Sequence, residues 1–147
     1  MCNRKIEKMK IGFTGTKKGM STEQIVAFHE LIDQLDHDEG ISEFHHGDCV
    51  GADADAHEIM YIGCDVIIHP PTNSSKRAYC KGYKELREEK EYLDRNKDIV
   101  DETNLLIAIP CGYLEQIRSG TWSTIRYARK QGKTIIILFP DGTSKTE

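Results

Sequence analysis

Three short loops carry the residues best suited to bind a small polar ligand. Each combines glycine with hydroxyl, carboxyl or basic side chains and comes directly before a segment with a helical pattern. They span residues 14–20, 46–53 and 118–122. Backbone N–H groups at a helix N-terminus attract anions, because they have no partner within the helix and lie at the positive end of its dipole. The three loops therefore predict a site for a molecule of nucleotide size.

The first and third loops suit a phosphate group. Thr14, Gly15, Thr16 and Lys17 offer backbone amides, hydroxyls and an ammonium group, although they match neither a P-loop nor a G-x-G-x-x-G fingerprint. A tight turn with solvated lysines is the alternative. In the third loop, Arg118 precedes a serine, a glycine and a threonine, and a guanidinium binds phosphate through two parallel hydrogen bonds.

Trp122 has two interpretations. The indole, the only one in the chain, is either a stacking partner for a base or a core anchor between a helix and the sheet.

The central loop is acidic. Asp48, Asp53 and Asp55 lie at or near the start of a helix, where the dipole favours carboxylates. The same carboxylates would repel a phosphate, so the phosphate is expected at the other two loops. Asp48 or Asp53 is then expected to accept hydrogen bonds from ribose hydroxyls or to hold the glycine turn. Ordinary helix capping explains at least one of the three acids.

Histidine and cysteine are frequent between residues 45 and 69, but their spacing matches no recognised zinc site. We therefore predict neither a metal nor a cofactor. His46, at a strand end, and His57 are better explained as groups that face the ligand or orient a loop. Cys49 precedes a helix N-terminus, a setting that lowers a thiol pKa. No residue pairs with Cys49 in a specific way, so an incidental cysteine is the better interpretation.

The hydrophobic pattern places these loops at one edge of a sheet. Segments typical of strands and helices alternate along the chain, which predicts a single α/β domain with a mostly parallel five-stranded sheet and helices on both faces. In such a sheet, ligands bind beyond the carboxyl ends of the strands, where the strand order reverses. All three loops directly follow a strand. The expected strands are 10–15, 43–46, 64–69, 104–110 and 133–139, and the expected helices are 22–36, one from about 52, 92–103 and 119–131.

Residues 70–91 interrupt this alternation. Two prolines end a strand, and the composition then shifts to Ser, Asn, Lys, Arg, Tyr and Glu. We expect an excursion from the core, with a charged helical turn near 85–91. A loop of this length is often a lid or a binding loop, and a solvated connection is the alternative. Arg77 in this segment, with Arg95 and Asn96 from the next helix, is expected to close over the ligand.

The composition excludes several classes of protein. A chain of 147 residues with 38% hydrophobic and 30% charged residues suits one globular domain. The net charge of −4 argues against nucleic acid as a partner, and no apolar run is long enough for a membrane span. The basic segment 1–10 lacks the apolar core of a secretory signal. Five scattered cysteines without a C-x-x-C pair indicate reduced thiols and a cytoplasmic location.

The chain resembles the SLOG superfamily of Rossmann-like domains, which includes the DprA and lonely guy proteins. It is most similar to a small stand-alone, YspA-like branch with an H-G-x-x-x-G-A-D pattern. The resemblance covers residues 10–142. It is carried by Gly12-Phe13-Thr14-Gly15-Thr16, His46-Gly47-Asp48-Cys49-Val50-Gly51-Ala52-Asp53, Arg95-Asn96 and Ser119-Gly120-Thr121-Trp122.

The resemblance implies a protein that senses or sequesters a nucleotide or a nucleotide-derived molecule, such as an ADP-ribose-like signal or a nucleoside monophosphate. Related proteins are often homodimers or larger oligomers, and the expected helix 92–103 is either an interface or part of the core. The ligand-binding residues predicted from the loops and the resemblance are Thr14, Gly15, Thr16, Lys17, His46, Gly47, Asp48, Gly51, Asp53, Arg77, Arg95, Asn96, Arg118, Ser119, Gly120, Thr121 and Trp122.

The lonely guy enzymes imply an alternative, because they hydrolyse the N-glycosidic bond of nucleoside monophosphates. Their G-G-x-G-T-x-x-E motif aligns its G-T with Gly120-Thr121, which places Thr124 where those enzymes carry a catalytic glutamate. A hydrolase of a glycosidic or phosphate bond would need another carboxyl group as its acid. The catalytic candidates are Asp48, Asp53 and Glu58. A purely structural or protein-binding domain with a vestigial pocket is the third interpretation.

Overall fold

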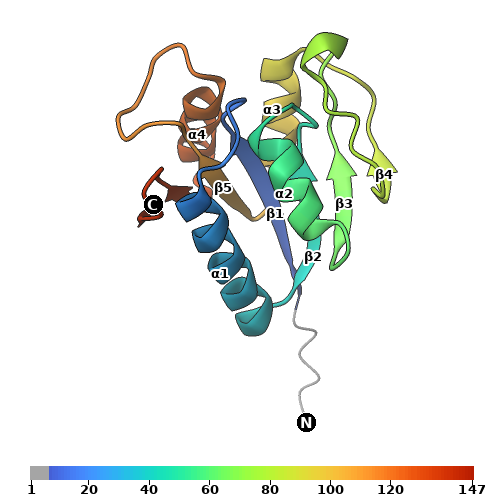
Figure 1. Cartoon of the computed structure of the whole chain (residues 1–147). Coiled ribbons are helices and arrows are strands. Elements are labelled where there is room, and N and C mark those ends of the chain that lie inside the picture. Colours follow the sequence, from blue (N-terminus) through green and yellow to red (C-terminus); the bar gives the residue numbers. More distant parts are fainter. Residues whose placement is uncertain (1–6) are drawn as a thin grey trace.

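The computed structural model describes residues 7–147, so Cys2 and most of segment 1–10 lie outside it. A seven-stranded sheet with the order β4-β3-β2-β1-β5-β6-β7 forms the centre of the molecule (Figure 1). All neighbouring strands pair in parallel except β6 and β7. The predicted α/β fold with a mostly parallel sheet is confirmed. The strands are β1 (Met9–Gly15), β2 (Ile41–His46), β3 (Asp65–Ile68), β4 (Glu85–Leu86), β5 (Leu105–Ile109), β6 (Thr134–Leu138) and β7 (Ser144–Thr146).

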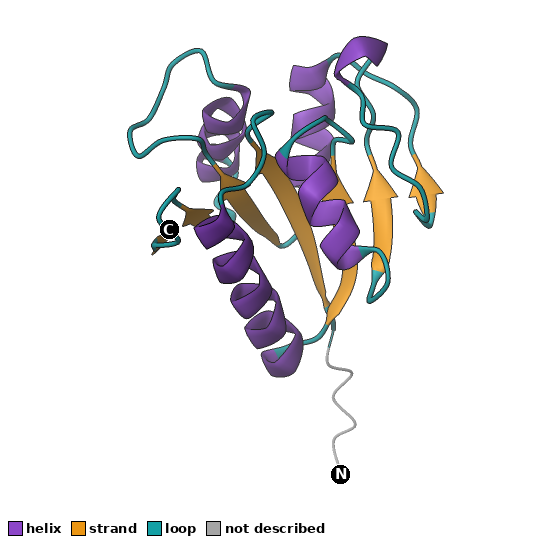
Figure 2. Ribbon diagram, viewed as in Figure 1, coloured by secondary structure: helices purple, strands orange, loops and turns teal. Residues whose placement is uncertain are grey.

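Helices cover both faces of the sheet, as predicted (Figure 2). They are α1 (Thr22–Asp38), α2 (Ala52–Met60), α3 (Tyr92–Asp101) and α4 (Gly120–Lys130), with a short 3-10 helix η1 at Ser74–Lys76. Helices α1 and α2 share one hydrophobic cluster, and α3 and α4 share another. Strand β5 contributes alternate residues to the two clusters, which explains its continuous apolar sequence. In α3, Ile99 and Val100 are buried in the core, whereas Tyr92 and Leu93 are exposed.

Two edge strands differ from the prediction. Residues 85–91 do not form the expected helical turn, because the backbone there extends the sheet beside β3. The N–H groups of Lys84 and Arg87 donate to the carbonyls of Val66 and Ile68, both at 2.9 Å. Charged residues are typical of an edge strand, where they discourage further pairing. Strand β7 follows the terminal turn and pairs with β6. Both additions depend on backbone pairing and carry no hydrophobic pattern.

Two further sequence expectations concern cysteines and membranes. Cys49, Cys64, Cys80 and Cys111 are free thiols. Within residues 7–147, no helix combines the length and the apolar character that a bilayer crossing requires.

The chain progresses outward from β1 in both directions across the sheet, so the strand order reverses between β1 and β5. The loop after β1 and the loop after β5 therefore diverge at that point. This is the position at which sheets of this class hold their ligands.

Candidate functional site

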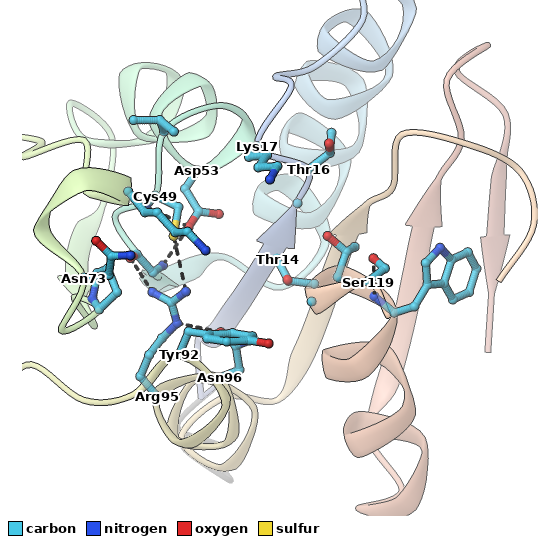
Figure 3. Close-up of a pocket in the computed structure, with 18 of the residues that line it drawn as sticks. Thr14, Thr16, Lys17, Cys49, Asp53, Asn73, Tyr92, Arg95, Asn96 and Ser119 are labelled. Atoms are coloured by element: carbon cyan, nitrogen blue, oxygen red, sulfur yellow. Dashed lines mark hydrogen bonds between the residues drawn. The ribbon is translucent and has the colours of Figure 1, made fainter. Parts of the chain in front are cut away.

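A cleft of about 650 Å³ lies beyond the carboxyl ends of the central strands. Residues from all three predicted loops line it, together with segment 71–76 and the start of α3 (Figure 3). Segment 70–91 is therefore part of the cleft wall as well as a connection. Of the predicted ligand-binding residues, the cleft brings together Thr14, Gly15, Thr16, Lys17, Gly47, Asp53, Arg95, Asn96, Arg118, Ser119, Gly120, Thr121 and Trp122.

Four predicted ligand-binding residues lie outside the cleft lining, namely His46, Asp48, Gly51 and Arg77. The catalytic candidate Glu58 lines a separate, shallower hollow beside Tyr61. These residues are therefore not in a position to contact a molecule in the cleft.

The three acids of the central loop hold backbone segments in place. Asp53 Oδ2 accepts hydrogen bonds from the N–H groups of Gly47 and Cys49, each at 3.2 Å. Asp55 Oδ2 accepts from the N–H of Met20 at 2.9 Å, which joins the first loop to α2. Of the two roles predicted for Asp53, that of holding the glycine turn is confirmed.

Asp48 is fully buried and joins the central loop to segment 77–80. Its Oδ1 accepts from the N–H of Cys80 at 2.9 Å, and its Oδ2 accepts from Arg77 Nε at 2.7 Å. The Arg77 guanidinium also lies over the ring of Tyr79, 4.5 Å from its centroid. Arg77 thus neutralises a buried carboxylate and does not close over the cleft. A one-dimensional pattern could not reveal this pairing between two distant loops.

The pKa of Asp53 is raised to about 6, chiefly because burial disfavours the carboxylate. Arg95 and the two backbone amides act in the opposite direction, and burial outweighs them. Asp53 lines the cleft and lies at the start of α2. Near pH 6, this carboxyl group is therefore protonated in a substantial fraction of molecules, whereas an ordinary aspartate is almost fully ionised.

Arg95 joins three elements beneath the cleft floor (Figure 3). Its Nη1 donates to the carbonyls of Gly47 at 2.5 Å and His69 at 3.1 Å. Its Nε donates to Asn96 Oδ1 at 2.6 Å, and its Nη2 to Cys49 Sγ at 3.3 Å. The side chain is buried, with 6% exposure. Arg95 lines the cleft, as predicted, but its donors already bind the ends of β2 and β3, so it is not a free clamp.

Gly51 explains how the first and second loops come together. Its φ is +96°, a left-handed conformation that favours glycine, and a Cβ there would overlap the backbone of Lys17. Next to it, the Ala52 N–H donates to the Thr16 carbonyl at 2.9 Å. Gly51 therefore allows the two loops to pack against each other, which places Thr16 and Lys17 at the cleft.

Cations outnumber acids around the cleft. The side chains of Lys17, Lys18, Lys76 and Arg118 line it, and none has a hydrogen-bond or ion-pair partner among residues 7–147. The N-termini of α2, α3 and α4 lie at the same edge of the sheet, where their dipoles add to the positive potential. Two acids, Asp53 and Glu91, also line the cleft. This arrangement favours an anionic ligand.

Several cleft residues were not predicted from the sequence. Asn73 and Lys76 come from the polar segment after β3, and Tyr92 and Glu91 come from the start of α3. Cys49 lines the cleft as well, and burial raises its thiol pKa, which argues against a thiolate nucleophile. A lysine in a polar segment carries no distinguishing signal, so only the path of the chain could identify these residues.

His46 and His57 form a buried hydrogen-bonded chain. The Asp48 N–H donates to His46 Nδ1 at 2.9 Å, His46 Nε2 lies 2.9 Å from His57 Nδ1, and His57 Nε2 lies 2.5 Å from the Lys81 carbonyl. An amide can only donate and a carbonyl can only accept, so both rings are neutral with the proton on Nε2. Burial lowers the pKa of His46 well below its usual value. His46 therefore orients a loop, one of its two predicted roles.

Two groups of side chains combine zinc-competent ligand types, a proximity that the sequence spacing did not predict. One group is His46, His57 and Cys80, and the other is His45, His69 and Glu102. In the first group, the hydrogen bonds place a proton on His46 Nε2, the nitrogen that would face a metal. In the second, Arg87 Nη2 donates a hydrogen bond to Glu102 Oε1 at 2.6 Å. Hydrogen bonding thus accounts for the arrangement of both groups.

The start of α4 supplies capping and core contacts. Ser119 Oγ accepts from the Trp122 N–H at 3.3 Å, which makes Ser119 the N-cap of the helix. Trp122 is only 5% exposed and packs with Ile125 and Ala128, so the core-anchor interpretation is confirmed. Thr124 Oγ1 donates to the Gly120 carbonyl at 2.9 Å and is buried. Position 124, which aligns with the catalytic glutamate of the lonely guy enzymes, therefore carries a hydroxyl that is hydrogen-bonded within the helix.

Comparison with known proteins supports the fold. The structure is similar to that of the molybdenum cofactor binding protein from the phototrophic bacterium Rippkaea orientalis, with a TM-score of 0.66 and 22% sequence identity. The similarity covers 90% of this chain and 77% of that protein. No family model matches the sequence, and no curated protein matches it. The similarity therefore supports the Rossmann-like α/β fold of this chain.

Proposed function

We propose that this chain binds a phosphorylated, nucleotide-type small molecule in the cleft and senses or sequesters it. The observation that carries the proposal is a set of four cations, Lys17, Lys18, Lys76 and Arg118, around a cleft at the reversal of strand order. Their side chains have no partner among residues 7–147. Three helix N-termini at the same edge add backbone donors for an anion. The phosphate would contact the loops 15–18 and 118–121, and the ribose would lie near Asp53.

Two resemblances narrow the ligand class. The SLOG-like motifs support an ADP-ribose-like signal or a nucleoside monophosphate, and they also support a homo-oligomer. The structural neighbour is described as a molybdenum cofactor binding protein, which makes that cofactor a further candidate ligand. The cleft volume of about 650 Å³ is within the range of pockets for ligands of this size.

Hydrolysis of the same kind of ligand is the second candidate function. One observation favours it: Asp53 lines the cleft with a pKa raised to about 6, suitable for protonating a leaving group. Asp48 and Glu58 do not line the cleft, so they are poor alternatives as the acid.

A thermal-shift panel followed by chromatography tests both functions. The panel contains AMP, ADP-ribose, NAD, cyclic ADP-ribose and the molybdenum cofactor. Under the binding proposal, at least one compound raises the melting temperature and is recovered intact. Recovery of cleavage products, lost in Asp53→Asn, would support hydrolysis. No shift with any of the five compounds would overturn both functions.

A further inference from the structure

Tyr92, the first residue of α3, presents an exposed aromatic ring to the cleft (Figure 3). The residue is 46% exposed. The other two aromatic residues that line the cleft, Phe13 and Trp122, are 1% and 5% exposed and belong to the core. Tyr92 is therefore the aromatic surface that a ligand in the cleft can reach.

Most tyrosines of the chain have a partner that explains their position. Each of four rings either stacks, lies beneath a cation or donates a hydrogen bond. These are Tyr61 stacked on His57 at 5.4 Å, Tyr79 beneath Arg77 at 4.5 Å, Tyr113 stacked on Phe139 at 5.9 Å and Tyr127, whose hydroxyl donates to Asp101 at 2.7 Å. Among residues 7–147, Tyr83 and Tyr92 have no such partner, and only Tyr92 lines the cleft.

The backbone around Tyr92 is held firmly. The Thr72 N–H donates to the Lys90 carbonyl at 3.1 Å, and Thr72 Oγ1 donates to Glu91 Oε1, also at 3.1 Å. These bonds join the start of α3 to the segment after β3. The backbone just before Tyr92 is thus tied to a second segment, which reduces the backbone entropy lost when a ligand binds.

The ring also lies beside the proposed phosphate site. A Cβ built on Gly120 would come 3.7 Å from Cε2 of Tyr92, which is ordinary contact. Gly120 is the first residue of α4, where the N–H groups face the cleft edge. A ligand that places a phosphate at this helix end can therefore place a planar ring on Tyr92.

We propose that Tyr92 is the platform on which a planar nitrogen heterocycle of the ligand stacks, so that the site selects phosphorylated heteroaromatic compounds over simple sugar phosphates. This inference rests on the proposed function and deepens it. Stacking on an aromatic side chain has no requirement for one particular base, because every base has a π face. Tyr92 is then a specificity residue, and the cations supply the phosphate affinity shared by both classes of compound.

Isothermal titration calorimetry with AMP, UMP and ribose 5-phosphate tests the inference. AMP and UMP represent purine and pyrimidine sources of the ring, and ribose 5-phosphate lacks it. Wild-type protein should bind at least one nucleotide about tenfold or more tightly than ribose 5-phosphate. Tyr92→Ala should abolish that difference and leave the affinity for ribose 5-phosphate unchanged.

Two variants control for the hydroxyl and for folding. Tyr92→Phe should retain wild-type affinity, because the hydroxyl has no partner among the described residues. Tyr83→Ala removes the other unpartnered tyrosine, away from the cleft, and should bind as the wild type does. Wild-type nucleotide affinity in Tyr92→Ala, or an equal loss for nucleotides and ribose 5-phosphate, would overturn the platform.

The experiment distinguishes failure of the stacking on Tyr92 from failure of phosphate binding by the cleft. Equal affinity of the wild type for nucleotides and ribose 5-phosphate overturns the platform alone and leaves phosphate binding intact. Absence of binding by all three compounds overturns the platform, and the five-compound thermal-shift panel then decides whether the cleft binds a larger phosphorylated ligand.

Discussion

The guanidinium of Arg95 occupies the space that a side chain on residue 47 would fill. Its Nη1 donates to the Gly47 carbonyl at 2.5 Å, and a Cβ on residue 47 would lie 2.6 Å from its Cζ. The same nitrogen binds the His69 carbonyl at 3.1 Å. One cation from α3 thus holds the ends of β2 and β3 together beneath the cleft, and glycine at position 47 makes this possible.

We predict that Gly47→Ala destabilises the fold by about 2–4 kcal/mol, because the new methyl group displaces a buried, hydrogen-bonded charge. Urea denaturation measures the free energy of unfolding. Gly63→Ala is the matched control, since a Cβ there meets no atom within 4 Å, and it should change stability by less than about 0.5 kcal/mol. Equal stability of the two variants would show that Arg95 can move at little cost.

Arg118→Ala should weaken the binding of a phosphorylated ligand by about 1–3 kcal/mol, because it removes a charge-assisted hydrogen bond. Calorimetry with the compound identified in the thermal-shift panel measures the loss. Lys130→Ala removes a positive charge outside the cleft lining and should leave the affinity unchanged. If Arg118→Ala binds as tightly as Lys130→Ala, the arginine is not part of the site.

Asp53 should make stability fall as the pH rises from 4 to 6. Its pKa is raised from 3.8 to about 6 in the folded chain, so the folded state holds the proton more tightly than the unfolded state. The resulting stabilisation is present below about pH 4 and is lost as the pH passes 6. Between pH 4 and pH 7, wild type should lose about 2 kcal/mol relative to Asp53→Asn.

Urea titrations of wild type and Asp53→Asn at several pH values measure this difference. Subtracting the unfolding free energy of the variant from that of the wild type at each pH removes the contributions of all other titrating groups. The change of this difference with pH then reports on Asp53 alone. Curves that remain parallel from pH 4 to pH 7 would mean that Asp53 titrates as an ordinary carboxyl group.

His69 should make stability fall as the pH falls, the opposite of the pH dependence expected from Asp53. Burial lowers its pKa from 6.5 to about 3, so the unfolded chain binds the proton more tightly. The stabilisation is therefore present above about pH 6.5 and is lost as the pH falls towards 3. Between pH 7.5 and pH 5, wild type should lose about 2 kcal/mol of unfolding free energy relative to His69→Gln. An NMR titration of His69 with a midpoint near 6.5 would contradict this.

The segment 70–91 shows where the sequence pattern stopped being informative. The residues between β3 and α3 are mostly polar, and they contribute a short edge strand, the partner of Asp48 and a cleft lysine. None of these roles depends on hydrophobic periodicity. They depend on backbone pairing and on single ion pairs between positions far apart in the chain, which have no local sequence signature.

The three loops show the opposite case. Each follows a predicted strand, and parallel strands place their carboxyl ends at one edge, so their convergence follows from the fold class. Of the thirteen predicted ligand-binding residues that line the cleft, eleven belong to these loops, and Arg95 and Asn96 come from α3. The roles within the loops were less predictable. Asp48 and Arg77 neutralise each other, and Gly51 makes room for a neighbouring backbone.

The sequence by itself determined the α/β class, the parallel sheet and the edge at which a ligand site would form. Hydrophobic spacing and glycine turns act over a few residues, and a one-dimensional pattern records them directly. Only the tertiary structure decided which polar residues line the cleft and which hold the loops. That choice depends on long-range partners. Arg95 binds the Gly47 carbonyl and Arg77 binds Asp48, whereas four cations around the cleft have no partner within the described part of the chain.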